Sequence, residues 1–198
     1  MNNSIIYTRR SIRKFQEKNV SKEIIEQIVD AGRLAPSAKN RQPWKYIVYG
    51  GRKKDELLTC MERGISREEQ GTPVLPNSGQ GIADAKNTLK IMKEAPIILI
   101  VLNTNGTTPF TGIDADHRIT EICDTLSIGA SIENILLKAE ELGIGTLWIA
   151  NTCFAYPELV TYLKTEHQLV GAIAVGYANE HPEQRPRKRL EDILEFRL

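Results

Sequence analysis

The chain has 198 residues, of which 41% are hydrophobic and 26% charged, and its formal net charge is +1. This length suits one domain, residues 1–198, that buries a core without metals or disulfides, and the composition excludes a disordered or fibrous protein. The near-neutral charge argues against nucleic acid as a partner. Because the longest apolar run, Ala95–Leu102, is less than half of what a membrane-spanning helix needs, we also expect no membrane partner.

Cysteine and histidine usage bears on the cellular compartment and on metals. The three cysteines are odd in number and widely spaced, and the first ten residues contain no apolar core long enough for a secretory signal. These features favour a reducing cytoplasm and free thiols. The three histidines have no metal-ligand spacing with one another or with the cysteines, so we expect no bound metal.

The pattern of apolar residues predicts alternating helices and strands. Ser21 is a suitable N-cap for a first helix, apolar residues recur with helical spacing from Ile24 to Val29, and Pro36 marks the end. The same reading then predicts strands over 45–50 and 95–102, a Gly- and Pro-rich surface loop or lid over 64–81, a helix over about 118–142, a strand within 143–151, a short helix near 156–165, a last strand over 169–177, and an extended arm over 185–198.

Strands separated by helices are compatible with a parallel α/β sheet, but the glycine fingerprint of a dinucleotide fold is missing. No Gly-x-Gly-x-x-Gly turn follows an early strand, and the glycines of "GIGTLW" lead into a strand rather than a helix. We therefore expect an α+β sandwich with a mixed sheet. The sequence also lacks a Gly-x-Ser-x-Gly elbow and a Walker loop, which leaves hydrolase and NTPase activities without support.

The centre of the long predicted helix, "LSIGASIENILL", is apolar around more than one face. Such a helix is buried on several sides, and the small residues Gly129, Ala130 and Ser131 would let another helix approach closely. Two interpretations remain open: a central helix within the core of one chain, or the interface of a dimer.

Two basic clusters lie near opposite ends of the chain, "YTRRSIRKF" at Tyr7–Phe15 and "RPRKR" at Arg185–Arg189. Guanidinium groups bind phosphate through paired, charge-assisted hydrogen bonds, so the first cluster suits a terminal phosphate. Its relevant residues are Arg9, Arg10, Ser11 and Arg13. The alternative is that these cations are simply solvated, as basic residues near a terminus usually are.

A polar segment, "APSAKNRQPWKYIV", precedes the first predicted strand. Its Ser37, Asn40 and Gln42 supply hydroxyl and amide groups that suit a heterocycle which both donates and accepts hydrogen bonds. The alternative is an ordinary polar loop, with Trp44 as part of the core.

Taken in order, "RRSIRKF", "PSAKNRQPW", "GIGTLWI" and "VGY" with "RPRKRLEDI" resemble the nitroreductase family of FMN-dependent oxidoreductases. The landmarks run from residue 9 to residue 193 and so cover nearly the whole chain. The resemblance implies a three-layer α+β sandwich with a mixed, mostly antiparallel sheet flanked by helices. It also implies an intertwined homodimer with two FMN sites at the subunit interface.

The resemblance assigns roles to the candidate residues. It implies that the two basic clusters grip the flavin phosphate through Arg9, Arg10, Ser11, Arg13, Arg185 and Arg187. It implies that Ser37, Ala38 and Asn40 contact the cofactor from the partner subunit, with Gln42 close by.

Further residues are implied beside the flavin ring. Asn87 and Lys90 match an Asn and Lys that relatives place there, and a cation near N1 would stabilise the reduced flavin; alternatively, Lys90 faces solvent. Where relatives often have Gly-Gly or Glu-Gly, this chain has Ala150 and Asn151, so Asn151 would narrow the space above the ring.

The expected function is therefore electron transfer from NADH or NADPH through FMN to a small flat acceptor, such as a nitroaromatic or a quinone, by a ping-pong mechanism. Chemistry would be carried by FMN, with no catalytic side chain required and Lys90 as a tuning group. The alternatives are a specialised relative, either a reductive dehalogenase or a flavin-consuming enzyme, and a non-catalytic protein that stores or senses flavin.

Overall fold

The computed structural model describes residues 4–198. The first three residues of the expected domain, which also begin the segment considered for a secretory signal, lie outside the described residues. At its centre is a sheet of four strands in the order β1-β2-β4-β3, in which all neighbours are antiparallel. The strands are β1 (Trp44–Gly50), β2 (Ile97–Asn103), β3 (Gly145–Ile149) and β4 (Gln168–Gly176).

The mostly antiparallel character that the sequence predicts is confirmed, and its parallel part is small. Among the described residues, the parallel pairing is an isolated bridge between Ser11 and Thr146, at the outer strand β3. A second isolated bridge, antiparallel, joins Phe15 to Ala178 beyond the end of β4. The N-terminal segment thus borders the sheet without forming a strand of its own.

The buried strand β2 divides the core into two halves. Successive side chains of a strand point to opposite faces, and in β2 Ile98 and Ile100 join one hydrophobic cluster while Leu99 and Val101 join the other. Both halves are closed by helices. The run of β-branched and apolar residues therefore forms a strand that is covered on both sides.

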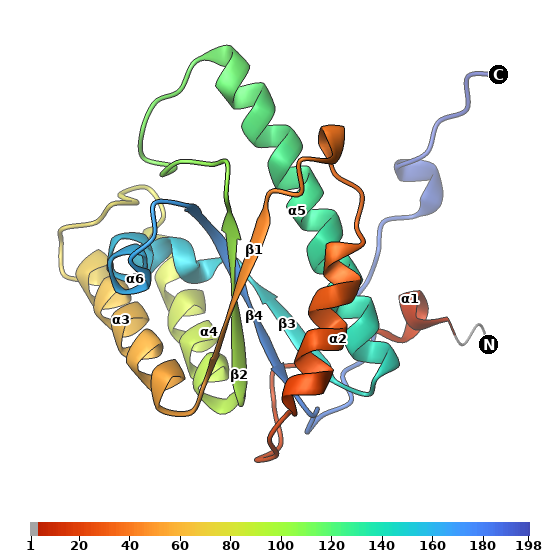
Figure 1. The fold of residues 1–198 in the computed structure, drawn as a ribbon, viewed down its shortest axis with the longest axis horizontal. Coiled ribbons are helices and arrows are strands. Elements are labelled where there is room, and N and C mark those ends of the chain that lie inside the picture. The colour runs from red at the N-terminus through yellow and green to blue at the C-terminus, as the bar shows by residue number, and fades with distance from the viewer. Residues whose placement is uncertain (1–3) are drawn as a thin grey trace.

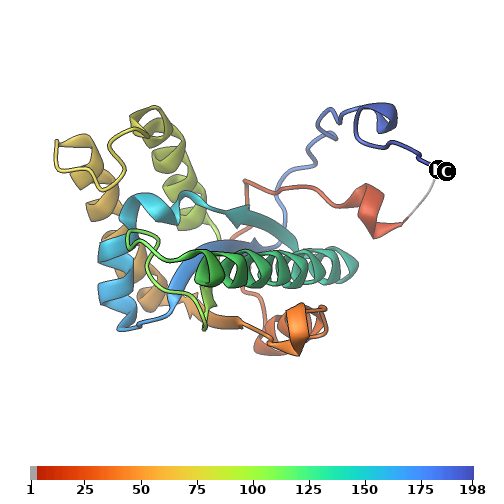
Figure 2. The same ribbon diagram turned by 90° about the horizontal axis from the view of Figure 1, so that it is seen from above.

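Helices cover the two faces of the sheet, giving three layers (Figures 1 and 2). One face carries α3 (Gly51–Glu69), α4 (Ile82–Glu94) and α6 (Tyr156–Leu163), and the other carries α2 (Lys22–Arg33) and α5 (Ala115–Glu141). Short turns complete the chain: α1 (Ile5–Thr8), and the 3-10 turns η1 (Ala38–Asn40), η2 (Gly79–Gly81), η3 (Asn151–Ala155) and η4 (Leu190–Asp192). The expected three-layer α+β sandwich is confirmed.

Two helix predictions hold closely. Helix α2 begins after Ser21, whose Oγ accepts a hydrogen bond from the backbone N–H of Ile24 at 3.4 Å. Helix α5 begins at Ala115, three residues before the predicted start, because the Asp114 side chain caps it by accepting from the N–H of His117 at 2.8 Å.

The predicted 64–81 loop is wrong in its first part, because Gly64–Glu69 are the last turns of α3. Gly64 does not mark a turn. A Cβ built on Gly64 would lie 2.4 Å from Ala155 Cα, so glycine is required here by close packing between α3 and the chain beside it. The irregular segment begins only at Gln70 and ends at the 3-10 turn η2.

After β4 the chain leaves the body of the molecule. Residues 183–198 are exposed and contain only the short turn η4, and Figure 2 shows this segment running away from the layers beside α1. Within residues 4–198, no helix is long and apolar enough to cross a membrane.

Candidate functional site

The two basic clusters meet in one pocket of about 430 Å³. Backbone pairing explains why they meet. The N–H of Gln16 donates to the carbonyl of Tyr177 at 2.9 Å, and the N–H of Asn179 donates to the carbonyl of Lys14 at 2.9 Å. The segment that follows the first cluster therefore runs along the segment that precedes the second. The pocket is lined by Ile6, Arg9, Arg10, Ser11, Arg13, Glu133, Pro182, Glu183, Gln184, Arg185 and Arg187.

The charge of this arginine pocket is positive. Its lining holds five arginines and two glutamates, which gives a formal charge of +3. One arginine is paired: Arg9 Nε lies 3.2 Å from Glu133 Oε1. Arg13 donates to the carbonyl of Ser11 at 3.0 Å, and Arg187 to the carbonyl of Arg185 at 3.1 Å, contacts that leave both charges uncompensated.

Arg10 differs from the other arginines of the pocket. Its Nη1 donates to the carbonyls of Tyr7, Thr8 and Arg9 at 2.7, 3.0 and 2.8 Å. Arg10 therefore holds the turn after α1 and Arg9 is paired with Glu133, whereas Arg13, Arg185 and Arg187 have no carboxylate partner within residues 4–198. A net positive pocket with guanidinium donors fits a phosphate-bearing ligand.

The segment Ser37–Gln42 forms a second polar group with an unusual backbone. Lys39, Asn40 and Gln42 have φ angles of 54°, 54° and 47°, in the left-handed region that L-residues rarely adopt. Ser37 Oγ accepts a hydrogen bond from the Gln42 N–H at 3.0 Å, and Gln42 Nε2 donates to Asn40 Oδ1 at 3.1 Å. This arrangement leaves the side chains of Lys39, Asn40 and Gln42 exposed.

Two residues of this region contact the layer of α2 and α5. The N–H of Ala38 donates to Ser127 Oγ on α5 at 3.2 Å. Trp44 is partly buried and packs against the hydrophobic cluster between the sheet and the α2 and α5 layer, as the alternative for this residue has it.

A third polar group lies on α4 and η3. Asn151 Nδ2 donates to Asp84 Oδ2 at 2.8 Å and to Thr88 Oγ1 at 2.9 Å, so this side chain points toward α4. Two exposed residues are the chain neighbours of these partners: Ala150 precedes Asn151, and Asn87 precedes Thr88 on α4. The amide of Asn151 is thus held in place rather than free to swing.

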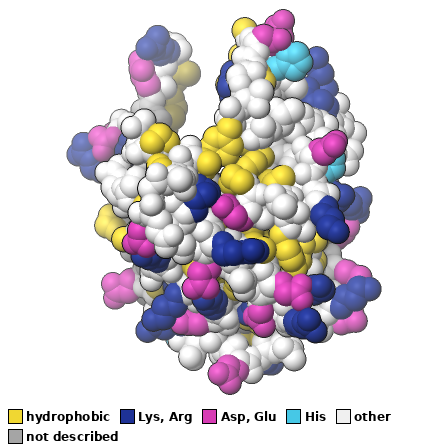
Figure 3. Space-filling model, turned by 90° about the vertical axis from the view of Figure 1, so that its left-hand side faces the viewer, with side chains coloured by type: hydrophobic (Ala, Val, Ile, Leu, Met, Phe, Trp, Pro, Cys, Tyr) yellow, Lys and Arg dark blue, Asp and Glu magenta, His cyan; other side chains and the backbone are white. Residues whose placement is uncertain are grey.

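Lys90 lies on the outer face of α4, where it lines a groove of about 330 Å³ between α3 and α4. The groove is bordered by two ion pairs, Lys86 with Glu69 at 2.6 Å and Lys93 with Glu62 at 3.1 Å. The structure therefore places Lys90 with other α4 lysines, as the solvent-facing alternative has it. Figure 3 shows charged side chains of both signs spread over this side of the molecule, with hydrophobic ones gathered toward its upper part.

Within one chain the three groups stay apart. Among the described residues, the lining of the arginine pocket includes Arg9, Arg10, Ser11, Arg13, Arg185 and Arg187, but it includes neither the Ser37–Gln42 segment nor any residue of α4 or η3.

Exposed apolar side chains form a surface along α5. Ile119, Ile122 and Leu126 are 62%, 48% and 71% exposed, and their spacing of three and four residues places them on one side of the helix. The same spacing continues to Gly129, which lies beside the 45% exposed Trp148, and to Glu133 in the arginine pocket. We call Ile119, Ile122, Leu126, Gly129 and Trp148 the α5 stripe.

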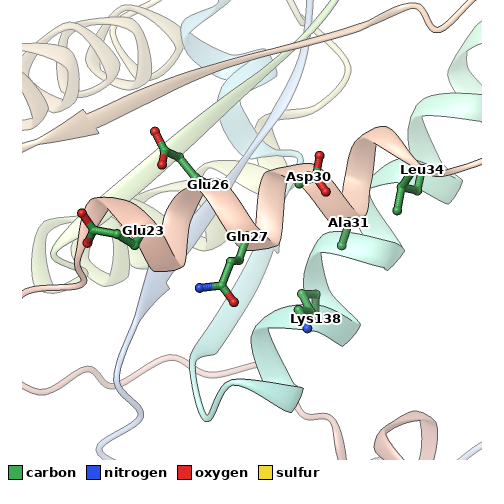
Figure 4. A pocket seen from close by; sticks show the side chains of 7 residues that line it. All are labelled: Glu23, Glu26, Gln27, Asp30, Ala31, Leu34 and Lys138. Carbon is green, nitrogen blue, oxygen red and sulfur yellow. The ribbon is translucent and has the colours of Figure 1, made fainter.

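A larger pocket, of about 790 Å³, lies between α2 and α5 (Figure 4). Its charged residues are the three α2 carboxylates Glu23, Glu26 and Asp30 and one lysine, Lys138. None of the predicted site residues lines it. Its negative character makes it unsuited to a phosphate, in spite of its size.

Sequence reasoning missed Glu133 and Asp124, two carboxylates of α5 that contact predicted site segments. Glu133 pairs with Arg9, and Asp124 accepts from Arg41 Nε at 2.8 Å. Both sit in the middle of a helical pattern, where an acidic residue signals an ordinary solvated face. Only the fold brings them to their arginines.

Together, the three layers and the arginine pocket define an α+β protein with a positively charged pocket. The profile of the nitroreductase family matches residues 6–177. The chain is 34% identical over 148 residues to an Archaeoglobus fulgidus protein named "Putative NADH dehydrogenase/NAD(P)H nitroreductase", covering 73% of this chain and 64% of that protein. It therefore belongs to the nitroreductase family.

Two further comparisons give the range of the likeness. The iodotyrosine deiodinase of Hydra vulgaris is 32% identical over 141 residues, which are 66% of this chain and 50% of that protein. The crystal structure of an FMN-dependent nitroreductase from Mycobacterium smegmatis in complex with NADPH superposes with a TM-score of 0.73 at 17% identity, covering 98% of this chain and 96% of that one. The matched region spans only part of the length of the Archaeoglobus fulgidus and Hydra vulgaris proteins.

Proposed function

We propose that this protein is an FMN-dependent oxidoreductase that takes electrons from NADH or NADPH and passes them to small flat acceptors such as nitroaromatics or quinones. The observation that carries the proposal is the arginine pocket, in which two clusters from opposite ends of the chain meet, and its positive charge suits a phosphate. The names of the relatives support the nicotinamide donor and the nitroaromatic acceptor.

The residues present fit FMN. Arg9, Arg13, Arg185 and Arg187 would bind the phosphate through charge-assisted hydrogen bonds, with the Ser11 hydroxyl as a further donor. Arg10 would act indirectly, because its guanidinium already holds three carbonyls of the preceding turn.

The homodimer is part of the same proposal. The α5 stripe exposes large apolar side chains that a second copy would cover, and the interface between copies would bring the Ser37–Gln42 segment of one chain toward the arginine pocket of the other. Ser37, Ala38, Asn40 and Gln42 would then contact the flavin from the partner. The exposed apolar side chains of the arm, Leu190, Ile193 and Phe196, also gain cover if the arm packs on a second copy.

Asn87, Lys90, Ala150 and Asn151 would lie toward the flavin ring and the substrate. Asn151, held by Asp84 and Thr88, would give the substrate side a fixed amide. When bound, FMN supplies the redox chemistry by accepting a hydride from the nicotinamide and passing electrons to the acceptor. The protein's residues bind and orient both partners, and a shared binding place for donor and acceptor would give ping-pong kinetics.

A second candidate function is reductive dehalogenation, which is favoured by the 32% sequence identity to the Hydra vulgaris deiodinase. The two functions differ in the acceptor. Release of halide from a halogenated phenol at a rate above that of quinone reduction would favour the dehalogenase.

The decisive experiment is the absorbance spectrum of the purified protein, followed by reconstitution with FMN. We expect the flavin bands, their bleaching by NADH or NADPH, and their return when a quinone is added. A colourless protein that cannot be reconstituted with FMN would refute the proposal, and rapid bleaching followed by recovery would exclude a flavin-storing protein.

A further inference from the structure

The Ser37–Gln42 segment is held in a conformation that its own residues disfavour. Three of its members, Lys39, Asn40 and Gln42, have positive φ angles, and none of them is glycine. The left-handed region costs an L-residue roughly 1–2 kcal/mol. Such backbone persists only where the surroundings fix it, and it concentrates at ligand sites.

The anchor is a buried carboxylate on α5. Asp124, which is 1% exposed, accepts a hydrogen bond at Oδ1 from Arg41 Nε at 2.8 Å, and Arg41 Nη2 lies 2.7 Å from the same oxygen as an ion pair. Its other oxygen, Oδ2, accepts from Asn105 Nδ2 at 3.2 Å. Arg41 lies between two of the strained residues, Asn40 and Gln42, so Asp124 acts on the middle of the strained run.

Asp124 is the charged member of a polar row on α5. One turn further along, Ser127 Oγ accepts from the N–H of Ala38 at 3.2 Å. Ser131 Oγ donates to the carbonyl of Gly32 at 2.7 Å, and Asn134 Nδ2 donates to the carbonyl of Ala31 at 3.1 Å. The row thus fastens the end of α2 and the strained segment to one face of α5.

The ion pair is largely buried, with the Arg41 side chain 26% and the Asp124 side chain 1% exposed, and such a pair is a poor choice if stability alone is required. Well-packed apolar residues often stabilise a fold as much or more, because taking two charges out of water costs several kcal/mol. An ion pair with defined donors and acceptors instead selects one geometry. The pair between Asp124 and Arg41 therefore fits a role in shaping the segment.

We propose that Asp124 is a positioning residue. Through Arg41 it sets the strained Ser37–Gln42 segment in the conformation that receives the flavin ring. This inference rests on the proposed function, because that segment is taken to contact FMN. Asp124 itself contacts no ligand in this scheme.

The test compares two substitutions with the same chemistry. Asp124→Asn keeps the shape but leaves one acceptor oxygen, which cannot serve both Arg41 and Asn105. The control is Asp30→Asn, because Asp30 also pairs with an arginine, Arg33 at 2.7 Å, but is 56% exposed. Arg41→Lys, which keeps the charge with fewer fixed donors, covers the case in which Asp124→Asn does not fold.

Two readouts are needed. Hydrogen exchange on the flavin-free protein follows the backbone amides of residues 38–42, of which those of Ala38, Asn40, Arg41 and Gln42 donate hydrogen bonds. The β2 peptide 97–103 reports global opening. Fluorescence titration then gives the affinity for FMN and for riboflavin. We expect faster exchange in 38–42 but not in 97–103, and about tenfold weaker binding of both flavins, since the ring contacts are shared by both. Arg41→Lys should give a smaller loss.

Several outcomes would overturn the inference. One is unchanged exchange of 38–42 in Asp124→Asn; another is faster exchange with unchanged flavin affinity. A loss confined to FMN would place the effect at the phosphate instead. Equal acceleration of 97–103 would make the role purely structural. If the unaltered protein binds neither flavin, the proposed function itself fails, and this is seen before any variant is compared.

Discussion

Arg9 and Arg187 lie near opposite ends of the chain and line one pocket. Sequence alone favours such a convergence only because two basic clusters in a near-neutral chain need a shared anion. It cannot show which guanidinium groups are free. In the structure, Arg10 is occupied by carbonyls and Arg9 by Glu133, so the arginines are not equivalent.

Replacing Arg9 or Arg187 with Ala should therefore weaken FMN binding selectively. A charge-assisted contact to phosphate contributes roughly 1.5–3 kcal/mol, or about tenfold to hundredfold in affinity. Riboflavin, which lacks the phosphate, should bind weakly to the unaltered protein and respond little to either substitution. The two effects should be non-additive, because both residues share one ligand group. Fluorescence titration of the flavin-free protein measures its affinity for FMN and for riboflavin.

The control for a general charge effect has to be chosen from the structure. Lys54, which looks like a surface residue in "GRKKDE", is buried, and its Nζ donates to the carbonyls of Lys93 and Ala95 at 2.9 and 2.8 Å. Arg52 is suitable, because its side chain is 92% exposed on α3, in the layer away from the arginine pocket. Equal losses of FMN affinity in Arg52→Ala and Arg9→Ala would rule out a phosphate clamp.

The same limit applies to Asp124. Its partner Arg41 is far away in sequence, and the pattern of α5 marks position 124 only as a polar interruption. Long-range ion pairs depend on which helix faces meet, and that is decided by the packing of the whole layer. Local propensity contains no such information.

At the scale of elements, helix α3 shows where local signals mislead. Glycine and proline are the strongest breakers in a sequence, and Gly64 therefore favours a loop that in fact starts at Gln70. The glycine serves packing instead, since a Cβ there would lie 2.4 Å from both Cα and Cβ of Ala155. By contrast, α2 and β2 are predicted well, because their patterns have strong helical spacing or unbroken burial.

Gly64→Ala should destabilise the protein, although alanine is the better helix former. The propensity gain is about 1 kcal/mol, but overpacking at a backbone contact costs typically about 1–3 kcal/mol or more. Urea denaturation should show a net loss of stability. Gly79→Ala is the matched control, because a Cβ on Gly79 meets nothing within 4 Å. A Gly64→Ala protein as stable as Gly79→Ala would show that α3 and Ala155 are not in close contact.

The irregular segment after α3 is pinned by one carboxylate. Glu68 Oε1 accepts from the N–H of Val74 at 2.8 Å, and Oε2 accepts from the N–H of Leu75 at 3.2 Å. Arg67 lies beside it and also binds Glu158 at 2.7 Å. Burial opposes ionisation of Glu68, but these donors outweigh it and hold its pKa below the ordinary value of 4.5. The expected free lid is therefore anchored at its start.

This pin should release in acid. A carboxyl whose pKa is lowered in the folded state contributes stability that is fully present above its ordinary pKa, here 4.5, and is lost as the pH falls through the lowered value. We expect the amides of Val74 and Leu75 to lose protection from hydrogen exchange in that window. Glu68→Gln should lose this protection already at neutral pH, because the amide that replaces the carboxylate has only one acceptor oxygen.

Glu69→Gln is the matched control for the pin, since Glu69 is about half exposed and pairs with Lys86 on the surface. It should leave the protection of Val74 and Leu75 unchanged. Protection that persists in Glu68→Gln would mean that other contacts hold the segment.

For the whole molecule, the sequence favours a sandwich of layers but cannot give the strand order. That order, β1-β2-β4-β3, depends on which strands pair across long connections. The sequence also leaves open whether the apolar centre of α5 is core or interface. The structure answers this for the side of α5 that faces the sheet. Ile128, Ile132 and Ile135 are fully buried within one chain, whereas the α5 stripe is uncovered.

Leu126→Glu tests what covers the stripe. Leu126 is 71% exposed in the single chain, so a glutamate there has little effect on the folding of one copy. In an interface, however, it buries an unpaired carboxylate, at a cost of several kcal/mol. We expect monomers by sizing and light scattering, together with loss of FMN, because the Ser37–Gln42 segment would no longer reach the partner's pocket.

Leu126→Met, which keeps the site apolar, should remain dimeric and retain FMN, as the small size change predicts. The substitution Ala130→Glu probes the adjacent, half-buried position in the same way. Monomers of Leu126→Glu that keep their flavin would show that each chain completes its own site, and a dimer that survives the charge would place the interface elsewhere.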